Sequence, residues 1–118
     1  MARPDDQRVR LEQLRVTALD RAQSAIAALT QLTHDRESSN DDDEHDPEGV
    51  TLSSEWSRLT GLADAAQAEL RQVEDALRRW DAGTYGVCAN CGRVIPEARL
   101  EARPFAELCV PCAEKAGR

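Results

Sequence analysis

The 118-residue sequence predicts a mostly α-helical protein, in which a long antiparallel helical hairpin with an acidic tip precedes a small C-terminal module built on four cysteines. Three observations predict this fold. Two stretches repeat apolar residues with the period of a coiled coil, an acid-rich segment separates them, and two C-x2-C pairs lie near the C-terminus. We therefore assign the hairpin to residues 1–83 and the cysteine module to residues 84–118.

The first arm of the hairpin is expected at about residues 5–34. Pro4 suits the first turn of a helix, and the acids Asp5 and Asp6 suit the positive end of the helix dipole. Apolar residues then recur about every 3.5 residues, as a coiled-coil seam requires. They are Leu11, Leu14, Ala18, Ala22, Ala25, Leu29 and Leu32.

The second arm is expected at about residues 47–82. Asp46-Pro47-Glu48 has the composition of a helix start, although Thr51 or Ser53 is an alternative start of the regular helix. Gly83 is a natural stop. Apolar residues occupy nine consecutive seam positions: Leu52, Trp56, Leu59, Ala63, Ala66, Leu70, Val73, Leu77 and Trp80.

Two apolar seams of similar length, joined by a polar segment, are expected to pack antiparallel as arms of ~45–50 Å. The alanines on both seams allow the arms to approach closely. Trp56 and Trp80 lie at seam positions, so we expect both rings in the core. A coiled-coil dimer is the alternative arrangement of the same two seams.

The tip, at residues 35–50, is strongly acidic. Eight acids and one base, Arg36, lie between Asp35 and Glu48, so this stretch carries −7, the formal net charge of the whole chain. A solvated loop is the simplest interpretation of such a charge run. Its position between two arms makes a functional role a second interpretation.

The composition excludes several classes of protein. An excess of acids argues against a protein that coats nucleic acid. No apolar run reaches the ~20 residues of a membrane span, and the N-terminus lacks the apolar core of a signal peptide. The sequence also has no nucleophile–base set and no phosphate-binding glycine loop. We therefore expect a cytoplasmic protein that is not an enzyme.

The four cysteines form two pairs, Cys88/Cys91 and Cys109/Cys112. Two C-x2-C pairs place four thiolates on a tetrahedron, which suits one Zn²⁺. Since sulfur fills all four positions, we expect this zinc to be structural rather than catalytic. A redox switch is the alternative. Residues 84–118 hold five bases and four acids, and this nearly neutral balance does not favour binding to DNA phosphates.

The stretch from Tyr85 to Cys112 resembles the DksA/TraR family, and the segment Pro-Glu-x-Arg-Leu-Glu-Ala-x-Pro at residues 96–104 is specific to that family. The resemblance extends over about residues 70–112, and over the hairpin it is architectural. It implies a bacterial transcription regulator that binds RNA polymerase. The hairpin would enter the secondary channel, and the zinc finger would rest on the channel rim.

The resemblance also implies roles for single residues. The acidic motif of the family's tip matches Asp43 and Asp46, with Glu48 in place of its alanine. By helix spacing, Arg99 and Arg103 fall one turn apart on one face of a short helix, where they can contact an acidic protein surface and, by the resemblance, the polymerase rim. Plain solvation of the two side chains is the alternative. Members that respond to the alarmone ppGpp carry basic residues along the second arm. The matching region here offers Ala65, Ala68 and Gln72, with only Arg71 nearby, so we expect no ppGpp site. The tip could also supply Mg²⁺ for RNA cleavage by the polymerase, as transcript-cleavage factors do.

Two other classes stay open. A structural adaptor would use the coiled coil to dimerise and the finger to dock elsewhere, without acting on RNA polymerase. The hairpin interpretation predicts instead a monomer of 13.0 kDa. A nucleic-acid-binding zinc module is the third alternative, and salt-dependent DNA binding would support it.

Overall fold

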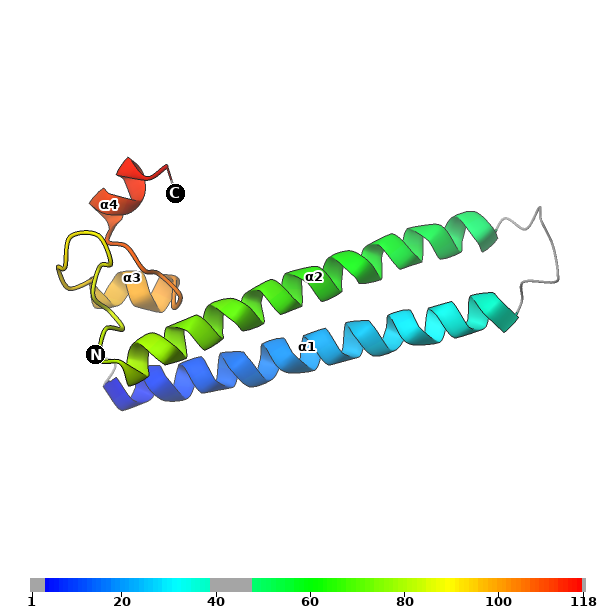
Figure 1. Cartoon of the computed structure of the whole chain (residues 1–118), viewed down its shortest axis with the longest axis horizontal. Helices are drawn as coiled ribbons and strands as arrows, with labels where there is room; N and C mark the ends of the chain where they lie inside the picture. Colours follow the sequence, from blue (N-terminus) through cyan, green and yellow to red (C-terminus); the bar gives the residue numbers. More distant parts are fainter. Residues whose placement is uncertain (1–3, 39–47, 118) are drawn as a thin grey trace. The chain divides into compact units, whose positions relative to one another are not determined.

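A computed structural model describes residues 4–38 and 48–117 of the chain (Figure 1). Two long helices, α1 (Pro4–Ser38) and α2 (Glu48–Asp81), precede two short ones, α3 (Glu97–Ala102) and α4 (Val110–Lys115). The predicted fold class, two long helices followed by a four-cysteine module, is confirmed. The chain forms two compact units. One consists of Met1–Arg15 with Arg71–Arg118, and the other of Val16–Leu70.

The long helices differ slightly from the expected arms at their ends. α1 continues four residues past position 34, to Ser38. Gln31 Nε2 donates a hydrogen bond to Asp35 Oδ1 at 3.0 Å, and Arg36 lies in the last turn, where a cation stabilises the helix dipole. The first acids of the charge run are therefore helical. α2 begins at Glu48 rather than at Thr51 or Ser53.

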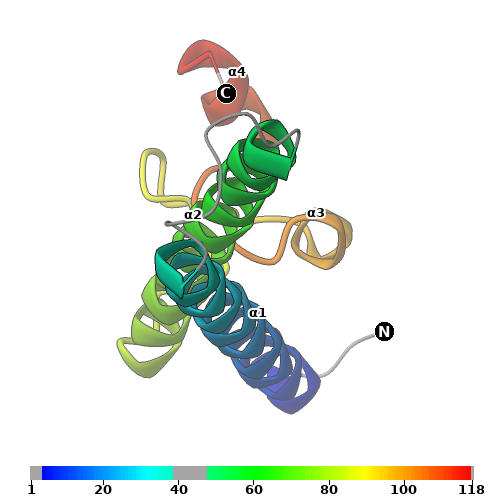
Figure 2. The same cartoon turned by 90° about the vertical axis from the view of Figure 1, so that its right-hand side faces the viewer.

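Within the unit of residues 16–70, α1 and α2 lie side by side and antiparallel (Figures 1 and 2). The buried residues are small on one helix and mixed on the other: Ala18, Ala22 and Ala25 on α1, and Leu59, Ala63 and Ala66 on α2. Arg21 and Glu69 form an ion pair between the helices at 3.6 Å. The predicted alanine seam therefore holds this unit together.

The expectation that Trp56 lies in the core is wrong, because the residue is 40% exposed. A pair of helices encloses only one narrow stripe on each partner, and the alanines leave little width between them. A large ring at the margin of that stripe therefore extends into solvent. Ile26 and Leu62 are exposed in the same unit, at 43% and 49%.

The second unit contains the first turns of α1, the last turns of α2 and the cysteine module. Leu11, Val73 and Ala76 are buried between the helices. Arg8 pairs with Asp81 at 2.9 Å, joining the start of α1 to the end of α2. Trp80 is half-buried, and its ring centroid lies 5.5 Å from that of Tyr85.

No helix in the described part of the chain combines the length and apolar composition that crossing a membrane requires.

Candidate zinc site

The first cysteine pair lies on a tight turn. Val87 and Val94 pair as an isolated antiparallel bridge, and Cys88 and Cys91 lie between them. The Cys88 amide donates to Arg93 O at 2.8 Å, and the Gly92 amide donates to Cys88 O at 3.0 Å. Gly92 has a φ of 77°, a conformation that residues with a Cβ rarely adopt. The glycine is therefore required where the sequence places it, directly after Cys91.

The second pair lies at the start of α4. Cys109 is the N-cap residue of this helix, and Pro111 occupies its first turn. The Ala113 amide donates to Cys109 O at 2.9 Å, so the helix turn brings Cys112 back beside Cys109. The Ala89 amide donates to Glu107 O at 2.8 Å, which joins the segments that carry the two pairs.

The four sulfur atoms fit a tetrahedral zinc ion. They all lie within 4.8 Å of one another. Cys91 Sγ and Cys109 Sγ are 3.7 Å apart. With Zn–S bonds of ~2.3 Å, the edge of a sulfur tetrahedron is ~3.8 Å. Cys88, Cys91, Cys109 and Cys112 would therefore hold one Zn²⁺, which supplies folding energy to the module, and the predicted zinc cofactor is confirmed.

The electrostatics of the thiols also favour a cation. Hydrogen bonds from the backbone amides of Cys91 and Cys109 lower the pKa of Cys88 to about 6. The amide of Cys112 acts to lower the pKa of Cys109, but burial and hydrogen bonds to neighbouring sulfurs outweigh it and raise that pKa to about 11. The fold thus stabilises one thiolate and opposes a second one close by. A divalent cation removes this conflict, because it stabilises all four thiolates together.

The apolar core of the module is small. Ile95 and Leu100 are buried together with three of the four cysteines, and Tyr85, Ala106 and Leu108 pack against them. So few apolar residues cannot stabilise a fold of this length alone, which agrees with a structural role for the metal.

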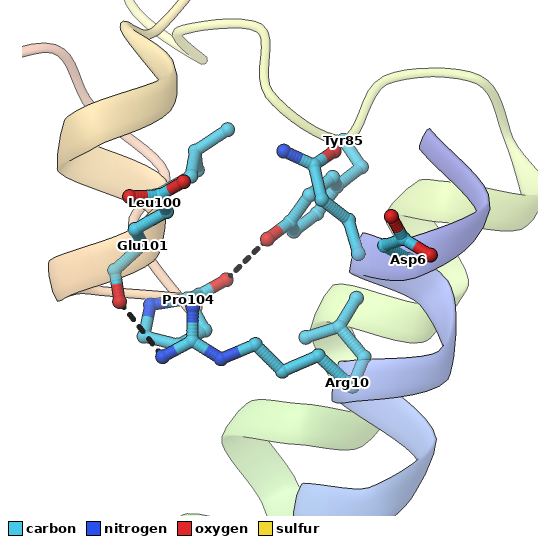
Figure 3. A pocket seen from close by; sticks show the side chains of 8 residues that line it. Asp6, Arg10, Tyr85, Leu100, Glu101 and Pro104 are labelled. Carbon is cyan, nitrogen blue, oxygen red and sulfur yellow. Dashed lines mark hydrogen bonds between the residues drawn. The ribbon is translucent and has the colours of Figure 1, made fainter. Parts of the chain in front are cut away.

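Two arginines that the sequence did not single out tie the module to the long helices of the same unit. Arg10 donates to Glu101 O at 2.7 Å, and Arg79 donates to Phe105 O at 3.3 Å and to Glu107 Oε1 at 3.0 Å. Figure 3 shows Arg10 extending from α1 toward α3. No local sequence motif could indicate either arginine, because their partners are 26 to 91 residues away in sequence.

Tyr85 makes a third tie, since its hydroxyl donates to Pro104 O at 2.9 Å (Figure 3). Burial raises the pKa of this phenol, so it stays protonated and able to donate. Tyr85, Arg10 and Pro104 border a small open pocket of about 390 Å³.

The predicted rim residues have different surroundings. Arg99 Nε donates to Leu108 O at 2.8 Å, so this partly buried side chain braces the segment before Cys109. Arg103 is exposed at the end of α3. Both border a groove of about 690 Å³ that also contains Gln72 and Glu114.

Of the predicted tip residues, Asp43 and Asp46 lie outside the described residues. Glu48 is the first residue of α2.

Comparisons with known proteins agree with this site. Residues 83–116 match the model of the prokaryotic dksA/traR C4-type zinc finger. A protein of Caulobacter vibrioides named RNA polymerase-binding transcription factor DksA is 40% identical over 65 residues, or 53% of this chain and 46% of that protein. General stress protein 16O of Bacillus subtilis is 36% identical over 74 residues, or 63% of this chain and 45% of that protein. This chain thus spans less than half the length of these curated relatives.

A solved structure shares the fold. The transcription factor DksA2 of Pseudomonas aeruginosa matches with a TM-score of 0.80 over 97% of this chain and 82% of that chain, at 23% sequence identity. The match therefore includes the long helices as well as the zinc finger.

Proposed function

The chain belongs to the DksA/TraR family of C4-type zinc-finger proteins, and from this we propose that it is a transcription regulator that binds RNA polymerase. The observation that carries the proposal is a four-cysteine module of family type in one chain with two long paired helices. Relatives in Caulobacter vibrioides and Haemophilus influenzae bear the name RNA polymerase-binding transcription factor. The protein would act without catalysis of its own, and its closed sulfur site leaves no position for a zinc-bound water.

The hairpin would act by entering the secondary channel of the polymerase. α1 and α2 contain 35 and 34 residues, so each is ~50 Å long at ~1.5 Å per residue. Helices of this length can carry the acidic segment deep into a channel. There the carboxylates of Asp43, Asp46 and Glu48 would act on the catalytic Mg²⁺ or on nearby basic loops through Coulomb interactions.

Arg103 is the better of the two candidate rim contacts. Its side chain is exposed, whereas that of Arg99 is engaged with Leu108 O. We expect Arg103→Ala to weaken binding to the polymerase at unchanged zinc content. Arg99→Ala would instead lower the stability of the module, because it removes the hydrogen bond to Leu108 O.

The groove beside Arg103 is a poor site for ppGpp. It is lined by three arginines, Arg79, Arg99 and Arg103, and by three acids, Asp75, Glu107 and Glu114. Arg79 and Arg99 already donate to groups of the module. A tetraphosphate needs an excess of cationic donors, so the effect of the protein on transcription would not change with ppGpp. A ppGpp effect that disappears in Arg71→Ala or Arg103→Ala would contradict this.

The tip is tested by transcription in vitro with polymerase from the same host. Asp46→Asn should abolish regulation and leave polymerase binding intact. Asp41→Asn is the matched control, because it removes the same charge from the same segment outside the proposed motif. Equal regulation by Asp46→Asn and the unaltered protein would remove Asp46 from the mechanism.

One observation favours a second candidate, an interaction adaptor that does not act on the polymerase. Leu62 is half-exposed in an apolar groove of about 610 Å³ that Leu59, Ala65 and Ala25 also line. Such a surface can serve as a dimer interface. Light scattering separates the two functions, because the regulator is expected to be a monomer of 13.0 kDa and the adaptor a dimer.

A further inference from the structure

Asn90 lies inside the first cysteine pair and reaches the second. Its side-chain Nδ2 is 3.3 Å from Cys112 Sγ. Its backbone amide is also one of the donors to the Cys88 sulfur. One residue thus donates to a sulfur of each pair, through its backbone on one side and through its side chain on the other.

The chemistry of a four-thiolate site explains why such a donor matters. Four thiolates around one Zn²⁺ leave a net charge of about −2, and hydrogen bonds to the sulfurs disperse that charge. The orientation of the Asn90 amide agrees, because its N–H group and not its carbonyl oxygen meets the sulfur. When the sulfur is a thiolate, this hydrogen bond is charge-assisted and therefore stronger than one between neutral groups. Cys112 itself is only 7% exposed.

We propose that Asn90 is a positioning residue of the zinc site, which holds Cys112 in place and stabilises its zinc-bound thiolate. The residue would thereby raise the affinity for zinc and slow its loss. It is not a ligand, and the spacing of the cysteines gives no indication of it. The inference goes beyond the proposed function, because it concerns zinc retention and holds whether or not the protein binds RNA polymerase.

The test measures zinc affinity by chelator competition in the full-length protein. Asn90→Asp keeps the shape of the side chain but replaces the donor with a charged acceptor. Partners of this kind typically contribute roughly 10–100-fold to metal affinity, so we expect a loss in that range. Asn90→Ala, which removes the donor without adding charge, should lose about 10-fold.

The matched control is Ala89→Asp, which adds the same charge at the neighbouring exposed position. Its zinc affinity should fall by much less than that of Asn90→Asp. Equal losses in the two Asp variants would show an effect of charge alone and would overturn the proposal. So would an unchanged affinity in Asn90→Ala.

A second measurement distinguishes positioning of Cys112 from a general loosening of the module. During zinc removal, alkylation followed by mass spectrometry records the order in which the cysteines react. In Asn90→Ala, Cys112 should react earlier relative to Cys91 than it does in the unaltered protein. An unchanged order would contradict a specific role toward Cys112.

Discussion

Residues 16–70 bury their apolar atoms along one seam between two helices, whereas residues 84–117 gather theirs around four sulfurs. The seam repeats the same contact turn after turn through small residues such as Ala22, Ala63 and Ala66. The module has only Ile95 and Leu100 as buried apolar residues besides the cysteines and Ala113. A seam of many similar contacts can lose one of them and stay folded. A module centred on one ion cannot stay folded without that ion, so the two regions should respond very differently to small changes.

The largest effect should come from removing a zinc ligand. Cys91→Ser should abolish stable zinc binding and unfold the module, because structural zinc contributes ~10–16 kcal/mol in small zinc domains. Cys91 is the exposed member of the four, so the substitution tests ligation more than packing. Zinc content and limited proteolysis measure the result. Helical circular dichroism from the seam should largely remain. One zinc per chain with unchanged thermal stability would refute the assignment.

The next effect should come from a core residue between the long helices. Leu11 is 1% exposed, and Leu11→Ala should lower the free energy of unfolding by about 2–5 kcal/mol. Val9→Ala is the matched control on the same helix, because Val9 is 52% exposed. Its cost should stay below about 0.5 kcal/mol. Similar costs in urea denaturation would mean that Leu11 is not a core residue.

A change that enlarges the seam tests the close approach of the helices. Ala66 is buried and Ala65 is exposed on the adjacent position of α2. Ala66→Leu should destabilise the protein by about 1–3 kcal/mol through overpacking. Ala65→Leu adds the same atoms to the apolar groove and should be nearly neutral. A tolerated Ala66→Leu would contradict an alanine-determined separation.

The smallest effect is expected at the tie between Tyr85 and Pro104. Tyr85→Phe removes one hydrogen bond and should cost about 1 kcal/mol near neutral pH. Burial raises the pKa of Tyr85 above its ordinary value of 10.0. The protonated phenol therefore makes its full contribution to the free energy of unfolding below pH 10.0. This contribution is lost as the pH rises through the folded-state pKa of Tyr85. Thermal unfolding at alkaline pH measures this loss.

In Tyr85→Phe, the alkaline part of the loss should be smaller than in the unaltered protein. The same pH dependence in both proteins would show that folding does not raise the pKa of Tyr85.

The sequence predicted what depends on local pattern. The seam alanines and the cysteine spacing follow from periodicity and coordination chemistry. The prediction that Trp56 lies in the core was wrong, because a seam position in a pair of helices does not guarantee enough width to enclose a large ring. Arg10, Arg79 and Asn90 were missed because their partners are distant in sequence, and such contacts leave no periodic signal.

The most direct test of the proposed function is the affinity of the zinc-loaded protein for core RNA polymerase of its own host, measured with and without a known secondary-channel factor. We expect binding at micromolar concentration or tighter that the competing factor displaces. Absence of binding, with zinc content and helicity intact, would contradict the proposed function.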